Sequence, residues 1–110
     1  ANPTSIKAAI SNFDKEVISN KVLVLGDMFE LGEHSEKEHQ DVVDLIDNKN
    51  YKKVYLVGNI FFNCESKEAH IEKFKSLDEM SKAIKLNDLH SMNILIKGSR
   101  GIGLEKLLNY

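Results

Sequence analysis

The sequence has little of several residue types that mark specialised classes of protein. It contains one cysteine, one proline and no tryptophan. A single cysteine excludes an internal disulfide framework, and a lone thiol is typical of reducing compartments, so we expect a cytoplasmic protein. No apolar run is long enough to span a bilayer, and the first residues lack the charged and apolar regions of a signal peptide. We therefore expect neither a membrane span nor secretion.

An excess of charge of one sign is also missing. Fifteen Lys and Arg residues accompany seventeen Asp and Glu residues, and basic residues do not alternate with aromatic ones along any segment. Nucleic acid is therefore not an expected partner. The 110 residues are 42% hydrophobic, which is typical of one compact domain. Because the chain begins at Ala1 without an initiator Met, we expect a piece of a longer protein or a processed chain.

Strand-like and helix-like segments alternate along the chain. Apolar runs predict strands at 21–25, 53–57 and 93–97, with a weaker candidate at 70–74. Apolar residues at helical spacing predict helices over about 5–15, 35–49 and 77–84, and a last helix bearing Leu104, Leu107 and Leu108. Continuous apolar strands separated by helices indicate parallel pairing with right-handed crossovers. We predict an α/β fold, a Rossmann-like three-layer sandwich with a mainly parallel sheet and helices on both faces.

Three helix starts carry capping signals. Residues 35–38 and 76–79 both have the capping-box pattern, in which a serine accepts from the third helical amide and a glutamate reaches back. In the first helix we expect Thr4 or Ser5 to cap, since both follow the single proline. Residues 59–63 are expected to form a loop or a short helical turn.

Two polar loops follow predicted strands, at 26–33 and at 98–103. If these strands are neighbours, Asp27 and Glu30 face Ser99 and Arg100 across a crevice, because open parallel sheets bind ligands beyond the carboxyl ends of their strands. Carboxylates and a guanidinium so placed suit a zwitterion. The alternative is structural: the glycines shape the loops, Asp27 accepts local amides, and Arg100 is solvated.

Other candidate motifs do not predict a site. The glycines at 98 and 103 match the first part of a Walker A loop, but Leu104-Glu105 occupies the place of its Lys and Ser or Thr. His34 and His39 would lie about 140° apart on one helix and make no metal pair. His39 lies on an apolar stripe, so we expect a packed or hydrogen-bonded histidine rather than a catalyst. Cys64 has no CxxC partner and no basic cluster beside it, which indicates a structural or incidental thiol.

Three motifs in order resemble those of a known family. They are Asn2-Pro3-Thr4-Ser5, then Leu25-Gly26-Asp27-Met28-Phe29-Glu30-Leu31-Gly32 with His39 downstream, and Ile96-Lys97-Gly98-Ser99-Arg100-Gly101. Together they resemble the carboxy-terminal domain of the Mur ligases. The resemblance spans essentially the whole chain. It is closest to the ligase type that joins D-alanyl-D-alanine to a UDP-N-acetylmuramoyl tripeptide.

The resemblance implies a three-domain, ATP-dependent amide ligase of peptidoglycan synthesis, of which residues 1–110 are the third domain only. In that family a central domain carries the phosphate loop and the Mg²⁺ ligands, and an N-terminal domain binds the UDP substrate. ATP phosphorylates the carboxylate of the muramoyl peptide, and the incoming amine then attacks the acyl phosphate. The isolated domain is expected to be inactive and to hold no cofactor. It is expected to contain no catalytic residue and no metal ligand.

The resemblance also implies site residues. One cleft-facing loop is matched by Asp27, Met28, Glu30 and Leu31, the other by Lys97, Ser99 and Arg100, and the nucleotide-proximal position by Asn2. We hypothesise that Arg100 pairs with the terminal carboxylate of the dipeptide, with help from Ser99. Either Asp27 or Glu30 then orients the amine. The competing function is a free-standing Rossmann-like binding or signalling module for a small anionic ligand at the same crevice.

Overall fold

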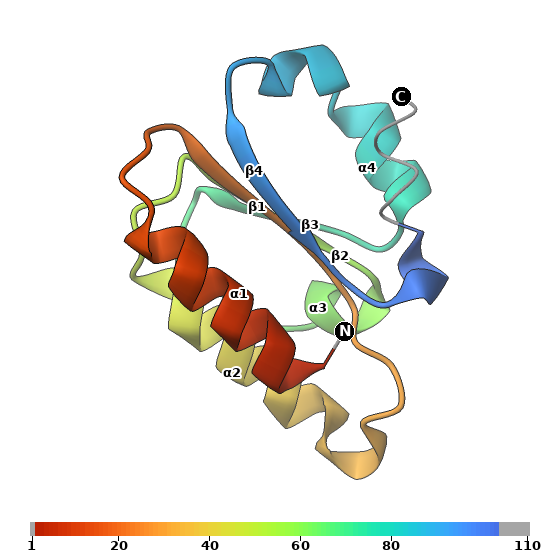
Figure 1. The fold of residues 1–110 in the computed structure, drawn as a ribbon. Helices are drawn as coiled ribbons and strands as arrows, with labels where there is room; N and C mark the ends of the chain where they lie inside the picture. The colour runs from red at the N-terminus through yellow and green to blue at the C-terminus, as the bar shows by residue number, and fades with distance from the viewer. Residues whose placement is uncertain (1, 104–110) are drawn as a thin grey trace.

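Four parallel strands form the centre of the molecule (Figure 1). The computed structural model describes residues 2–103, without the side chains of Leu86, Asn87 and Arg100. The strands are β1 (Lys21–Gly26), β2 (Lys53–Val57), β3 (Ile71–Phe74) and β4 (Asn93–Lys97), in the spatial order β3-β2-β1-β4. All three neighbouring pairs are parallel, so the predicted sheet is confirmed, including its weak third strand.

Helices cover both faces of this sheet, which confirms the three-layer sandwich (Figure 1). One face packs against α1 (Pro3–Lys15), α2 (Ser35–Asp47) and the short α3 (Asn59–Phe62), and the other against α4 (Leu77–Ala83). Single 3₁₀ turns lie at Gly32–His34, Leu86–Leu89 and Arg100–Ile102. The predicted short helical turn after β2 is therefore α3.

The central strand β1 is buried on both faces. Leu23 and Leu25 belong to the core under α1 and α2, whereas Val22 and Val24 belong to the core under α4. All four side chains are fully buried. Alternate residues of a strand point to opposite faces, so a sheet covered on both sides needs apolar residues at every position. This is why the strands could be recognised as continuous apolar runs.

The first helix begins earlier than predicted. Asn2 is its N-cap and accepts a 2.8 Å hydrogen bond from the Ser5 amide, while the Asn2 amide donates back to Ser5 Oγ. The expectation that Thr4 or Ser5 caps the helix was wrong. Pro3 takes the first helical position, where its missing N–H costs nothing and its φ is already helical. The reciprocal Asn2 and Ser5 bonds then form a capping box around it.

The predicted capping box at the start of α2 is also wrong, whereas the one at α4 is partly confirmed. The 3₁₀ turn before α2 continues directly into the helix, so Ser35 already has helical backbone angles and cannot act as an extended cap. At α4, Ser76 Oγ accepts from the Glu79 amide at 3.1 Å as expected. The Glu79 carboxylate accepts from the Lys75 amide instead of that of Ser76.

The last predicted helix, bearing Leu104, Leu107 and Leu108, lies outside the described residues. Within residues 2–103, no helix has the length and apolar character that crossing a membrane requires.

Candidate functional site

The two polar loops meet at the carboxyl edge of the sheet. β1 and β4 are neighbours, with Leu25 paired to Lys97. The Ser99 amide donates to the Asp27 carbonyl at 3.1 Å, and the Phe29 amide donates to Ser99 Oγ at 3.0 Å. The strands are neighbours, as the predicted crevice requires, but the two loops are joined directly by hydrogen bonds that involve the main chain of both.

The Asp27 carboxylate is turned into the protein, away from the β4 loop. Asp27 is 2% exposed, and its carboxylate accepts two 2.9 Å hydrogen bonds, from the amides of Ile60 and Phe61. These amides open α3, so the carboxylate satisfies helix N–H groups that have no partner within the helix. This arrangement matches the structural alternative for Asp27. It leaves Glu30 and Glu33 as the loop carboxylates that are exposed to solvent.

His39 is a fully buried member of the same cluster. Its Nε2 accepts from the Met28 amide at 2.9 Å, and its Nδ1 lies 2.7 Å from the Ser35 carbonyl oxygen. A carbonyl only accepts, which assigns the ring proton to Nδ1 and makes Nε2 the acceptor. The ring also packs edge-on against Phe61, with centroids 4.7 Å apart. The expectation of a packed, hydrogen-bonded histidine is confirmed.

The other residues that the resemblance selected differ in their exposure. Met28 is fully buried, and Leu31 is half-buried against the core under α1 and α2. Lys97 is exposed and Ser99 is half-buried. Asn2 is exposed and uses its side-chain oxygen as the cap of α1, and the Arg100 side chain lies outside the description. Among the residues that the resemblance selected, Glu30 and Lys97 are thus the charged side chains that the described structure shows as exposed.

Sequence reasoning did not single out Phe29, an exposed aromatic residue between the two loops. Its side chain is 44% exposed, although large apolar side chains are usually buried. One edge of the ring lies over Gly101: a Cβ added at Gly101 would be 2.6 Å from Phe29 Cε2. The missing side chain at Gly101 therefore leaves room for this edge of the ring. Its position inside a polar loop was a usable signal, because exposed apolar residues there are often placed for contact.

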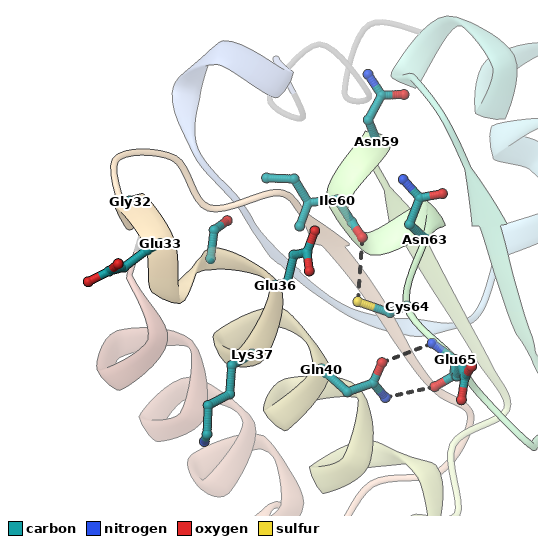
Figure 2. Close-up of a pocket in the computed structure, with 11 residues that line it drawn as sticks. Gly32, Glu33, Glu36, Lys37, Gln40, Asn59, Ile60, Asn63, Cys64 and Glu65 are labelled. Carbon is teal, nitrogen blue, oxygen red and sulfur yellow. Dashed lines mark hydrogen bonds between the residues drawn. The ribbon is translucent and has the colours of Figure 1, made fainter.

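The loop after β1, residues 26–33, is called the acidic loop below. An open groove of about 900 Å³ lies beside it, on the side of β2 rather than β4 (Figure 2). Polar side chains from α2 and from the segment after β2 line it, among them Glu36, Gln40, Asn59 and Asn63. The Gln40 amide group closes one wall by two 2.9 Å bonds to the main chain of Glu65, drawn as dashed lines in Figure 2. None of these residues was predicted for the site.

Cys64 also lines the groove but is unsuited to nucleophilic chemistry. The thiol is buried and donates to the Ile60 carbonyl at 3.4 Å, as Figure 2 shows. Burial raises the pKa of Cys64 to about 11, and only the nearby Lys73 opposes this effect. Thiolates, not thiols, are nucleophiles, so the assignment of a structural cysteine is supported.

Comparison with known proteins gives the family. A family model described as "Mur ligase, glutamate ligase domain" matches residues 1–100. The chain belongs to the Mur ligase family. The ligase motifs of the sequence thus coincide with the two strand-end loops that meet in the structure and with the cap of α1.

Curated relatives of this Mur ligase domain carry one functional name. The UDP-N-acetylmuramoyl-tripeptide–D-alanyl-D-alanine ligase of Rickettsia prowazekii is 34% identical over 113 residues, which cover 100% of this chain and 25% of that protein. The ligase of the same name from Bacillus subtilis is 35% identical, covering 98% of the chain and 25% of the relative. The chain therefore spans about a quarter of the length of these relatives.

Solved structures agree with the fold. A crystal structure of MurF from Acinetobacter baumannii superposes with a TM-score of 0.81 at 29% identity, over 99% of this chain and 25% of that one. MurF ligase from Thermotoga maritima, solved in complex with ADP, gives a TM-score of 0.78 over 99% of this chain and 25% of that one. At 24% identity the second likeness supports the fold alone.

Proposed function

We propose that this chain is the third domain of a ligase that adds D-alanyl-D-alanine to a UDP-N-acetylmuramoyl tripeptide. Its task in the whole enzyme is to help bind the incoming dipeptide and to close over the nucleotide. The names of the curated relatives support the reaction. The observation that carries the role of this domain is the direct contact between the loops after β1 and β4, made by the Ser99 amide on the Asp27 carbonyl and the Phe29 amide on Ser99 Oγ.

The charges on these loops suit the two ends of the dipeptide. Glu30 is exposed on the first loop, and we assign it to the ammonium group. Lys97 ends β4 and Arg100 follows it. A guanidinium fork matches a carboxylate better than an ammonium does, so Arg100 is assigned to the terminal carboxylate. Ser99 Oγ accepts from Phe29, which leaves its own O–H able to donate to the same carboxylate.

This assignment divides the acidic loop into contacting and supporting residues. The Asp27 carboxylate already accepts two α3 amides, and Met28 is fully buried. We therefore propose that Asp27, Met28 and Leu31 support the loop and that Glu30 contacts the amine. An exposed carboxylate attracts an ammonium group only weakly, which helps the amine to deprotonate before it attacks.

The nucleotide chemistry is proposed to lie on other parts of the enzyme. Among the described residues, no three His, Cys, Asp or Glu side chains converge as a metal site would require. The described residues thus offer no such cluster for Mg²⁺. We propose that the ATP and Mg²⁺ sites lie on upstream domains and that, of this domain, only Asn2 comes near the nucleotide on closure. We also propose that the enzyme is cytoplasmic.

The test is the effect of Arg100→Ala on the two substrates of a full-length enzyme that carries this domain. We expect the KM for D-alanyl-D-alanine to rise about tenfold or more while the KM for ATP changes less than about twofold. Lys52→Ala is the matched control, because it removes an exposed positive charge at the opposite edge of the sheet. Equal effects on both KM values would contradict the role of Arg100. Phosphate release that requires another amine would contradict the reaction.

A further inference from the structure

We propose that His39 is a positioning residue of the dipeptide site, which holds the acidic loop by both of its ends. The inference rests on the proposed function for its kinetic consequence. The observation that supports it is that both ring nitrogens of His39 form hydrogen bonds to the main chain. Nε2 accepts from the amide of Met28, where the loop begins, and Nδ1 donates to the carbonyl of Ser35, where α2 begins.

Met28 needs this acceptor because its amide is buried where the sheet ends. Asp27 is the last residue of this segment with a sheet-like bond: its amide donates to the Val57 carbonyl at 3.0 Å. The next residue, Met28, is fully buried, so water cannot replace a lost partner. A buried amide without an acceptor has lost its hydration and gained no bond in return, which favours displacement of the main chain.

The loop that the ring closes contains a strained residue at the proposed contact. Glu30 has a φ of +65°, in the left-handed region that residues with a side chain rarely occupy. Such a conformation persists only where its surroundings hold it. The ring of His39 fixes the chain before and after Glu30, and the Phe29 amide on Ser99 Oγ fixes the tip. His39 therefore acts on the dipeptide through the position of Glu30, without touching the substrate.

Asp27 makes the support rigid. Its carboxylate joins the end of β1 to two amides in the first turn of α3, and its carbonyl accepts from the Ser99 amide. Phe61, whose amide binds this carboxylate, also packs its ring on that of His39. The loops after β1, β2 and β4 are thus joined around two buried residues, Asp27 and His39.

Two substitutions separate the two ring contacts. In His39→Gln, the amide oxygen reaches the place of Nε2 and can accept from Met28. In His39→Asn, the shorter side chain reaches only the place of Nδ1. We expect the Met28 contact to matter more, because the Ser35 carbonyl also lies in register with a helical amide. Val43→Ala is the control: it removes buried volume from the same helix, one turn farther from the loop.

The first measurement is kinetic, on the full-length enzyme. We expect His39→Asn to raise the KM for D-alanyl-D-alanine about tenfold with little change in the KM for ATP, and His39→Gln to stay within about threefold of the natural enzyme. Val43→Ala should lower thermal stability without raising the KM for D-alanyl-D-alanine relative to that for ATP. A rise with Val43→Ala equal to that of His39→Asn would show a general loss of stability and overturn the proposal. The same rise in both His39 variants would overturn it too.

The second measurement does not depend on the reaction. Hydrogen exchange of the peptide covering residues 28–34 in the full-length enzyme should accelerate in His39→Asn and stay slow in His39→Gln and Val43→Ala. Unchanged exchange in His39→Asn overturns the positioning role. In the natural enzyme, ¹⁵N spectra of labelled histidine should show a proton on Nδ1 of His39, and a proton on Nε2 instead would overturn it without any variant. If turnover requires another amine but exchange behaves as expected, the dipeptide assignment fails and the positioning role stands.

Discussion

The carboxylate of Asp27 occupies the space that a side chain at residue 58 would need. A Cβ added at Gly58 would lie 2.3 Å from Asp27 Oδ2, and Gly58 has a φ of +124°. The two residues directly follow neighbouring strands, β1 and β2. Because residue 58 has no side chain, Asp27 can reach the amides of Ile60 and Phe61 directly behind it. The glycine after β2 is therefore part of the support of the loop after β1.

Gly58→Ala should be strongly destabilising. The new Cβ meets a buried carboxylate, and alanine disfavours this φ, so we expect a loss of about 2–4 kcal/mol in the free energy of unfolding. Urea unfolding followed by circular dichroism measures it. Gly32→Ala is the control, since Gly32 also has a positive φ of +60° but no atom within 4 Å of its added Cβ. Its loss should be about 1 kcal/mol. Equal losses would show that Asp27 does not matter to Gly58.

Gly101→Ala should alter the contact between the loops rather than the stability of the core. The added Cβ would press on Cε2 of Phe29, and this ring is partly exposed and can move. We expect a rise of about threefold to tenfold in the KM for the dipeptide in the full-length enzyme, with unfolding free energy changed by less than about 1 kcal/mol. In the double variant with Phe29→Ala the clash disappears. Additive effects of the two substitutions would contradict direct contact.

Asn2 has two roles that can be separated, the observed cap and the proposed place beside the nucleotide. Asn2→Ala removes the cap and should cost about 1 kcal/mol of unfolding free energy, whereas Asn2→Ser keeps a cap and should cost only a few tenths. If Asn2 lies beside the nucleotide, both variants should raise the KM for ATP in the full-length enzyme. A rise in the alanine variant alone would indicate that only the cap matters.

Cys64 should make stability fall at alkaline pH. Its pKa in the folded chain is about 11, against an ordinary value of 9.0. Between these values the unfolded thiol ionises and the folded one does not, so rising pH favours unfolding. The contribution of Cys64 is therefore complete below pH 9 and is lost towards pH 11. We expect the free energy of unfolding to fall less steeply over this range in Cys64→Ala. Parallel curves for the two proteins would contradict a raised pKa.

The thiol should also react slowly. At pH 8 the thiolate fraction of a group with a pKa near 11 is about 100-fold below that of an ordinary cysteine. Alkylation by iodoacetamide should be slower than that of a cysteine-containing peptide by at least this factor, because burial adds to the effect. As a control, alkylation in urea, which unfolds the chain, should proceed at the same rate for Cys64 and for the peptide.

The strands could be recognised from the sequence because their environment is uniform. β1 is buried on both faces, so Val22 to Leu25 form an unbroken apolar run. The helix starts were harder to place. The same Ser-x-x-Glu pattern caps α4 but not α2, because a 3₁₀ turn at Gly32–His34 already leads into the second helix. Capping patterns describe local preferences, whereas the path of the preceding chain decides whether a cap is needed.

The sequence by itself determined the α/β alternation, the family motifs and the two polar loops that end β1 and β4. These depend on local properties: the spacing of apolar residues, and glycines and charges at strand ends. Only the tertiary structure decided that the Asp27 carboxylate is turned inward, that Glu30 and Glu33 stay exposed, and that His39 bonds to the main chain of Met28 and of Ser35. Asp27 bonds to amides 33 and 34 residues away in the chain, and Gly58 makes room for it. Such contacts arise from the order of the strands in the sheet, which brings distant residues together and which no local pattern contains.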